Sequence, residues 1–179
     1  MTTQIQPEAP HRRIVLTGFM GSGKTTVGPL VANLLGWRFV DVDDVIEAEA
    51  GVAITEIFVQ HGEEAFRERE HETIARLAES NHLVLALGGG AIEHPKTRSL
   101  LVSTPRTMLV HLEVELATTI ARCSGTENTR PILADKTNLE SRYARRLPLY
   151  RSAHISIAVD QLTPAEVAEL IVKAAQTSR

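Results

Sequence analysis

Residues 14–26 read IVLTGFMGSGKTT, an apolar run followed at once by a loop rich in glycine. The loop fits the pattern G-x-x-x-x-G-K-[ST], with Gly18, Gly23, Lys24 and Thr25 at the fixed positions. Glycines let several backbone N–H groups face one anion, and the positive end of a following helix adds to the attraction. The stretch predicts a strand, a phosphate-binding loop and a helix, whereas the alternative is a flexible glycine turn.

The loop also indicates which groups would hold a nucleoside triphosphate such as ATP. Lys24 can reach the terminal phosphates, and the Thr25 hydroxyl can hold magnesium. The histidines show no close pairing at metal-ligand spacing, which argues against a histidine-bound metal. Magnesium, which prefers hard oxygen ligands, is therefore the metal that the sequence indicates. The predicted nucleotide contacts within the loop are Gly21, Ser22, Gly23, Lys24, Thr25 and Thr26.

Short strand-like runs alternate with longer helical patterns along the chain. The predicted strands are Ile14–Leu16, Arg38–Val40, Leu83–Leu87, Met108–Leu112 and Ile155–Val159. The predicted helices are Lys24–Leu35, Asp44–Ala50, Glu63–Ser80, Leu116–Cys123, Leu139–Tyr150 and Pro164–Ala175. This alternation predicts a three-layer α/β fold, with a parallel sheet covered by helices on both faces. Ligands of such sheets bind at the carboxyl ends of the strands.

Length and composition predict one ordinary globular domain. The chain has 179 residues, of which 43% are apolar and 23% are charged. The net charge of −3 argues against a nucleic-acid partner, and no apolar stretch is long enough to span a membrane. The single cysteine, Cys123, permits no internal disulfide and fits a cytoplasmic protein. We expect a flexible tail over residues 1–11, a single domain over residues 12–179, and a monomer.

The longest irregular stretch, residues 124–138, reads SGTENTRPILADKTN. It is too polar for a core and too long for a plain turn, so we predict a mobile lid. Arg130 lies inside this stretch, and a lid arginine can neutralise charge on a phosphoryl group during its transfer. Arg130 is therefore a candidate catalytic residue.

Acidic residues follow the second predicted strand, where residues 39–44 read FVDVDD. Asp41 and Asp43 share a face if the strand continues, beside the phosphate loop at the carboxyl edge of the sheet. One carboxylate would support magnesium, and another would engage a substrate hydroxyl. The alternative is that Asp43 or Asp44 caps the helix that follows.

The helix predicted over residues 63–80 places Arg67 near its apolar face and Arg69 well away from it. Glu70 lies near the centre of the same face, one turn from Arg67, and a half-buried arginine needs such a partner. Two interpretations stay open. The pair is either a structural ion pair at the helix edge, or Arg67 points into a cleft and is held there by Glu70.

Gly88, Gly89 and Gly90 follow the third predicted strand, again at its carboxyl end. Three glycines would allow the backbone to approach a ligand closely. The alternative is a tight strand-to-helix turn, which would rarely need all three.

Taken together, these motifs resemble the shikimate kinase family from about residue 13 to residue 175. The similar segments are GFMGSGKTTVG, FVDVDDVIE, ITEIFVQHGEEAFRERE, LALGGGA, TRPIL and RLPLYRSAH. Many NTPases share the phosphate loop, whereas D-x-D, G-E-x-x-F-R-x-x-E and G-G-G in this order are far more specific. The resemblance implies a five-stranded parallel sheet in the order 2-3-1-4-5. It also implies ATP- and magnesium-dependent phosphorylation of the 3-hydroxyl of shikimate, in chorismate and aromatic amino acid biosynthesis.

The resemblance implies roles for the residues that bind the acceptor and the metal. Asp43 would bind the shikimate hydroxyls and take part in catalysis, and Asp41 would support magnesium together with Thr25. Arg67 and Arg146 would grip the substrate carboxylate, with Glu70 bracing Arg67. The substrate pocket would be lined by Gly88, Gly89 and Gly90.

On the nucleotide side, the resemblance implies that Arg130 is the lid arginine that contacts the transferred phosphoryl group. Arg122 would stack near adenine, close to the loop 160–164. This sequence departs from the family at two places: the spacing from Arg122 to Arg130 is one residue longer than expected, and Ala86 stands where some members carry serine. Neither change removes a group that the chemistry requires.

Three other functions fit the sequence less well. A gluconate-type kinase has the same loop and a similar size, but no matching histidine–proline motif follows Asp43. A nucleotide kinase would need a second nucleotide motif, which is not evident. A kinase-like binding protein without catalysis would usually have lost the loop lysine, the acceptor aspartate or the lid arginine, and all three are present here.

Overall fold

The computed structural model of the chain describes residues 11–123 and 136–177. Its strands form one 5-stranded sheet in which every neighbouring pair is parallel. The strands are β1 (Arg13–Thr17), β2 (Arg38–Asp41), β3 (Leu83–Ala86), β4 (Thr107–Glu113) and β5 (Ile155–Ala158). Their spatial order is β2-β3-β1-β4-β5, which confirms the predicted order 2-3-1-4-5.

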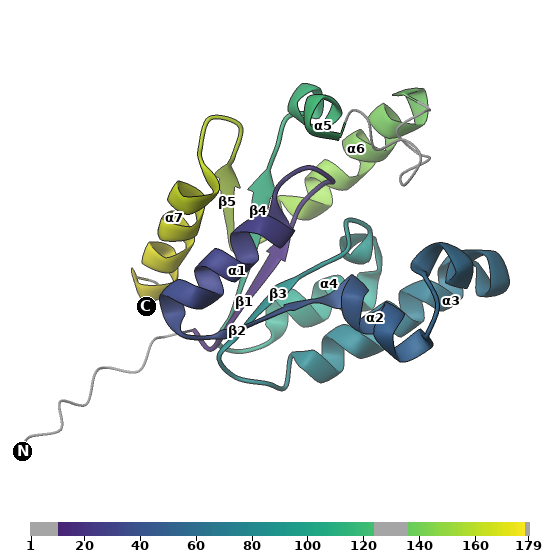
Figure 1. The fold of residues 1–179 in the computed structure, drawn as a ribbon, viewed down its shortest axis with the longest axis horizontal. Helices are drawn as coiled ribbons and strands as arrows, with labels where there is room; N and C mark the ends of the chain where they lie inside the picture. Colours follow the sequence, from purple (N-terminus) through teal and green to yellow (C-terminus); the bar gives the residue numbers. More distant parts are fainter. Residues whose placement is uncertain (1–10, 124–135, 178–179) are drawn as a thin grey trace, which may run out of the picture.

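Helices cover both faces of the sheet, which confirms the three-layer prediction (Figure 1). α1 and α7 pack against each other on one face, and α3 and α4 lie on the other. The α-helices are α1 (Lys24–Leu35), α2 (Val42–Ala50), α3 (Ile54–Leu77), α4 (Pro95–Ser103), α5 (Leu116–Cys123), α6 (Lys136–Tyr150) and α7 (Pro164–Thr177). A short 3-10 helix, η1 (Ala91–Glu93), follows the glycine triplet.

The three central strands form the core because both of their faces are covered. All residues of β1 and β3 are buried, as is β4 up to its last residue. The edge strands β2 and β5 are only partly buried. The continuous apolar runs in the sequence therefore mark the centre of a parallel sheet.

The strand register sets the position of the site. Leu16 of β1 and Asp41 of β2 both pair with Ala86 of β3, so these three strands end at the same level. The segments that follow them are the phosphate loop, the start of α2 and the glycine triplet. These three segments therefore meet at the carboxyl edge of the sheet, as predicted for the ligand site.

Several helix predictions are wrong in their bounds. The predicted helix over residues 63–80 is the second part of α3, which begins at Ile54 and bends at Gly62 (φ 79°, ψ 171°). α2 begins at Val42 rather than Asp44, so the strand does not continue through Asp43. No helix was predicted over α4, where little more than Thr97 and Leu101 is buried and the apolar stripe is correspondingly weak.

Two predicted regions fall largely outside the described residues. Of the predicted tail only His11 is described, and of the predicted lid only residues 136–138, which form the first turn of α6. Arg130 lies outside the described residues. Of the helices within 11–123 and 136–177, none combines the length and the apolarity that crossing a membrane would require.

Close packing of α1 on β2 generates a test of the fold. Gly28 is buried in α1, and a Cβ added there would overlap the ring of Phe39. We expect Gly28→Ala to destabilise the protein by about 1–2 kcal/mol, because overpacking outweighs the gain of about 1 kcal/mol in helix propensity. Urea unfolding followed by Trp37 fluorescence measures this change. In a Phe39→Leu background the same substitution should cost less, and an equal cost in both backgrounds would contradict the packing argument.

Candidate active site

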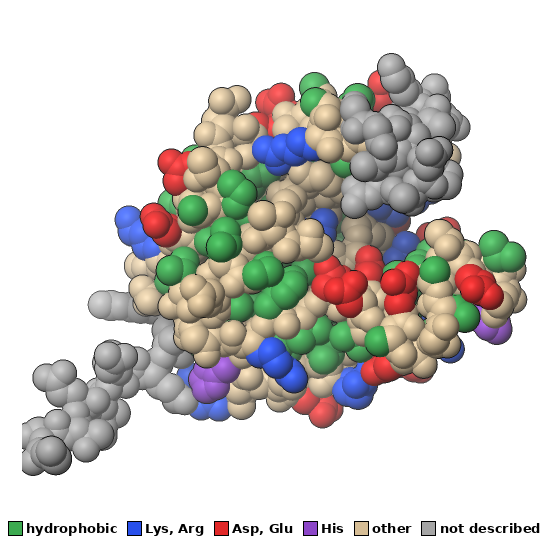
Figure 2. Space-filling view, in the orientation of Figure 1, with side chains coloured by type: hydrophobic (Ala, Val, Ile, Leu, Met, Phe, Trp, Pro, Cys, Tyr) green, Lys and Arg blue, Asp and Glu red, His purple; other side chains and the backbone are tan. Residues whose placement is uncertain are grey.

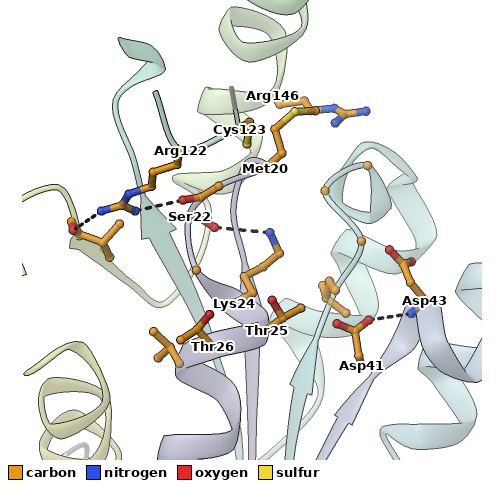
Figure 3. A pocket seen from close by; sticks show the side chains of 18 of the residues that line it. Met20, Ser22, Lys24, Thr25, Thr26, Asp41, Asp43, Arg122, Cys123 and Arg146 are labelled. Atoms are coloured by element: carbon orange, nitrogen blue, oxygen red, sulfur yellow. Dashed lines mark hydrogen bonds between the residues drawn. The ribbon is translucent and has the colours of Figure 1, made fainter. Parts of the chain in front are cut away.

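A cleft of about 930 Å³ opens at the carboxyl edge of the sheet, and it is lined by every predicted site residue that the structure describes. Figure 2 shows the hollow in the surface, with basic side chains inside it. In the close view of Figure 3, Lys24 lies between Arg122 on one side and Asp41 and Asp43 on the other. The predicted site residues that line the cleft are Gly21, Ser22, Gly23, Lys24, Thr25, Thr26, Asp41, Asp43, Arg67, Gly88, Gly89, Gly90, Arg122 and Arg146.

The phosphate loop has the backbone that its glycines predict. Gly23 adopts a left-handed conformation (φ 91°) directly before α1, and no side chain caps that helix end. The first N–H groups of a helix lack intrahelical acceptors, so those at the start of α1 face the cleft with their positive dipole end. Lys24 Nζ donates to Gly18 O at 2.8 Å and Phe19 O at 3.2 Å, which holds the ammonium within the loop.

The groups around the loop fit a magnesium-bound triphosphate. The N-terminus of α1 and Lys24 supply the positive groups that phosphates need. Thr25 and Asp41 both line the cleft and offer hydroxyl and carboxylate oxygens, the donors that magnesium prefers. Magnesium is usually held by one or two carboxylates together with substrate phosphates, so a site with one carboxylate and one hydroxyl from the protein fits the ion.

Asp41 and Asp43 lie together by a route that the sequence analysis did not predict. Asp41 ends β2 and is the N-cap of α2, with its Oδ1 accepting the Asp43 N–H at 3.0 Å. The alternative considered from the sequence, that Asp43 or Asp44 caps this helix, is wrong because the helix starts earlier. Asp43 is therefore free of the capping role and lies in the first turn of α2, with its side chain lining the cleft.

Burial controls the ionisation of Asp43. Desolvation, followed by the nearby charge of Asp41, raises the pKa of Asp43 to about 6, against the opposing effects of Lys24 and Arg67. Burial also raises the pKa of Asp41. A carboxyl with a pKa near neutrality, placed beside a phosphate loop, is suited to accept a proton or to orient a hydroxyl.

Arg67 points into the cleft and is paired with Glu70, so both interpretations of this pair are correct in part. Arg67 Nη1 donates to Glu70 Oε2 at 2.6 Å, while Arg67 itself lines the cleft. The side chain of Glu70 is 1% exposed, and burial raises its pKa to about 7 although Arg67 opposes the shift. The Arg67 guanidinium also lies 5.1 Å from the centre of the Phe66 ring, which restricts its position further.

The glycine triplet is needed for close approach and not for an unusual turn. None of Gly88, Gly89 and Gly90 has a positive φ. A Cβ on Gly88 would lie 2.7 Å from Asp43 Oδ1 and 2.9 Å from Glu70 Oε1, and a Cβ on Gly90 would overlap the Arg67 guanidinium. The triplet therefore leaves the space in which the acidic and basic side chains of the site converge.

Arg146 also lines the cleft, and the residues that hold it were not predicted from the sequence. Arg146 is 4% exposed, and its Nε and Nη2 contact Glu93 Oε2 at 2.8 and 2.7 Å. The Tyr150 hydroxyl donates to Gly89 O at 2.5 Å and accepts from Arg146. Arg142 also lines the cleft and was not predicted. A contact between η1 and α6 has no sequence signal, because about fifty residues separate Glu93 from Arg146.

Arg122 lies at the other end of the cleft. Its Nη1 donates to Gly21 O at 3.0 Å, and its Nη2 donates to Val159 O at 3.4 Å. It therefore joins the phosphate loop to the end of β5, where Leu162 and Pro164 provide an apolar wall. This position is compatible with the adenine side of a nucleotide site.

Comparisons with known proteins agree with this geometry. The shikimate kinase family profile matches residues 20–176. The chain is 45% identical to a shikimate kinase of Francisella tularensis subsp. novicida, over 90% of this chain and 92% of the relative. It is 43% identical to one of Thermobifida fusca, over 89% and 92%. A solved shikimate kinase from Acinetobacter baumannii, in complex with shikimate, superposes with a TM-score of 0.84 at 37% identity and covers 92% of each chain.

The family match spans most of the chain, and the matching part contains the phosphate loop from Met20 onward, together with Asp41, Asp43, Arg67 and Arg146. The order of the strands and the side chains that converge at their carboxyl ends are those expected from the motifs. The chain belongs to the shikimate kinase family and is an ATP-dependent kinase.

Proposed function

We propose that the protein transfers the γ-phosphoryl group of ATP to the 3-hydroxyl of shikimate, giving shikimate 3-phosphate and ADP. The observation that carries the proposal is a single cleft that joins a phosphate loop to an acceptor pocket with two arginines and the half-buried Asp43. The phosphate loop alone would fit many kinases. The acceptor pocket fits a small molecule that carries one carboxylate and adjacent hydroxyls.

Arg67 and Arg146 would bind the shikimate carboxylate. A guanidinium offers two parallel N–H groups to a carboxylate, which lysine cannot do. Both side chains are held by carboxylates, Arg67 by Glu70 and Arg146 by Glu93, so little side-chain entropy is lost on binding. Asp43, on the phosphate-loop side of this pair, would orient the hydroxyl that attacks.

The transfer step would depend on positioning and charge stabilisation. The proton leaves the attacking hydroxyl with Asp43 as its acceptor, the new bond forms between the hydroxyl oxygen and the γ-phosphorus, and ADP leaves with the bridging oxygen. Lys24 would stabilise charge on the terminal phosphates, and Arg130 is proposed to do so from the predicted lid. Magnesium, held by Thr25 and Asp41, would neutralise phosphate charge when bound.

The alternatives receive less support from the site. A gluconate-type kinase remains the nearest competitor, because gluconate is also a hydroxylated carboxylate. A binding protein without catalysis would not need both Lys24 and Asp43 directed into the same cleft. We also propose that the protein is a cytoplasmic monomer without nucleic-acid partners, which the single cysteine and the net charge of −3 support.

The function is tested by coupled measurement of ADP release with a panel of acceptors. We expect release in the presence of ATP, magnesium and shikimate, and only background release with gluconate, a nucleoside monophosphate or no acceptor. Omission of magnesium should abolish the rate. Good release with gluconate and none with shikimate would overturn the proposal.

The arginine pair gives a prediction about affinity. Arg67→Ala and Arg146→Ala should each weaken shikimate binding by roughly ten- to a hundred-fold, since a charged hydrogen bond is worth about 1.5–3 kcal/mol. The Kd of ATP should change little, because neither side chain belongs to the phosphate loop. Calorimetric titration of each variant with each ligand measures both effects. If Arg67→Ala simply unfolds the protein, the pair with Glu70 is structural.

Asp43 gives a prediction about rate. Asp43→Asn should keep the fold and the affinity for ATP but lose most of the activity, because an amide can hydrogen-bond but can neither take a proton nor carry charge. Steady-state rates and shikimate titrations separate the two contributions. A lost rate with normal shikimate affinity assigns the effect to charge or basicity, whereas lost affinity assigns it to orientation of the hydroxyls. Near-normal turnover would show that the acceptor site is on another residue.

The same substitution should stabilise the ligand-free protein. The folded-state pKa of Asp43, about 6, lies above the ordinary value of 3.8 for an aspartic acid side chain, so the folded state favours the neutral carboxyl. Stability from this group is complete below about pH 4 and is lost as pH rises through about 6. Asp43→Asn never ionises, so at pH 8 it should unfold with a free energy higher by about 1–3 kcal/mol. The gain should shrink toward pH 4, and a gain that does not depend on pH would contradict the argument.

A further inference from the structure

Glu93 is the last residue of η1 and accepts from two consecutive arginines of α6. Its Oε1 accepts the Nε–H of Arg145 at 2.8 Å, and its Oε2 lies 2.8 and 2.7 Å from Nε and Nη2 of Arg146. Burial would raise the pKa of Glu93, but the hydrogen bonds from Arg146 and Arg145 lower it below its usual value. The carboxylate is therefore ionised at neutral pH and holds both guanidinium groups.

The two arginines differ in their surroundings. The Arg146 side chain is 5% exposed, whereas that of Arg145 is 60% exposed. With Nε and Nη2 directed to Glu93, Arg146 presents Nη1 toward Gly89, where an added Cβ would lie 3.6 Å from that nitrogen. Of these two arginines only Arg146 lines the cleft. Glu93 can therefore affect a ligand in the cleft through the orientation of Arg146, but not through that of Arg145.

We infer that Glu93 is a positioning residue for shikimate, acting through Arg146. This inference rests on the proposed function of the cleft. The carboxylate holds one edge of the Arg146 guanidinium so that its other edge faces the acceptor pocket before the substrate arrives. A side chain that is already in the bound orientation loses less conformational entropy on binding, so Glu93 increases the affinity for shikimate without touching it.

Arg145 counteracts an electrostatic disadvantage of holding Arg146 with the carboxylate of Glu93. A carboxylate beside Arg146 reduces the attraction of that guanidinium for the substrate carboxylate. Arg145 offsets this effect, because two guanidinium groups on one carboxylate leave the cluster with a net charge of +1. Arg145 is largely exposed, so solvent screens its contribution, and the positioning by Glu93 is the larger effect.

The test is a double-mutant cycle on the Kd of shikimate, measured by calorimetry with ATP titrated separately. Glu93→Ala should weaken shikimate binding about ten-fold and change the Kd of ATP less than two-fold, with kcat within about three-fold. Glu93→Gln keeps an acceptor oxygen for Arg146 and should stay within about three-fold of the unmodified protein. In an Arg146→Ala background, Glu93→Ala should change shikimate affinity less than two-fold.

Two control variants complete the design. Arg145→Ala removes the exposed partner of the same carboxylate and should change the Kd of shikimate at most two-fold. Glu49→Ala breaks an exposed ion pair between α2 and α3, with Arg76, and should change nothing in the cleft. If Glu93→Ala does not fold, Glu93→Asp replaces it, because the shorter side chain cannot reach both guanidinium groups. The changes expected in the Kd of shikimate, the Kd of ATP and kcat are then those given for Glu93→Ala.

The outcomes separate this inference from the proposed function. Failure of the unmodified protein to bind shikimate overturns the proposed function itself. Normal binding by the unmodified protein and by Glu93→Ala overturns the role of Glu93. A ten-fold loss that persists in the Arg146→Ala background also overturns it, because Glu93 would then act independently of Arg146.

Discussion

The buried carboxylate of Glu70 is the constraint on which the acceptor pocket depends. It lies under the glycine triplet and holds Arg67 at 2.6 Å, and its other oxygen, Oε1, faces the position that a Cβ of Gly88 would occupy. Within the described residues, Oε1 is buried without a hydrogen-bond partner, which is costly for a polar atom. The absence of side chains at Gly88 and Gly90 lets Glu70, Asp43 and Arg67 converge, so the strand-end loop and the polar cluster require each other.

Bringing these charged side chains together lowers the stability of the folded protein but provides groups that its function requires. Asp43 and Glu70 are carboxylates whose pKa values are raised by burial, to about 6 and about 7, and the charge of Asp43 adds to the rise in the pKa of Glu70. Removing the charge of Asp43 would stabilise the folded protein at neutral pH, whereas removing that of Glu70 would leave Arg67 without its nearest carboxylate. The protein keeps both, because the acceptor hydroxyl needs a carboxylate beside it and the substrate carboxylate needs an arginine with a fixed direction. The fold offsets this cost through the apolar core of β1, β3 and β4.

The parts of the site that were predictable from the sequence are those encoded over a short stretch of chain. The phosphate loop, the Arg67–Glu70 pair at i,i+3 and the strand order follow from spacing, periodicity and the family motifs. The start of α2 was predicted two residues too late, at Asp44, because a strand end and a helix start are equally compatible with the residues FVDVDD. The helix over residues 95–103 was missed, since its contacts with α3 and β4 give only a weak apolar periodicity. The contact of Glu93 with Arg146 was not predictable, because nothing local relates η1 to α6.

The two arginines of the acceptor pocket therefore differ in how they are held. Arg67 and its carboxylate lie on the same helix, so their geometry is fixed once the second part of α3 forms. Arg146 and its carboxylate lie on different elements, so their geometry exists only when α6 is packed against η1. Tyr150 adds a second link from α6, to the glycine triplet before η1, by donating to Gly89 O at 2.5 Å. Any movement of α6 relative to the sheet would leave Arg67 in place and displace Arg146, which makes the grip on the substrate carboxylate dependent on the docking of a single helix.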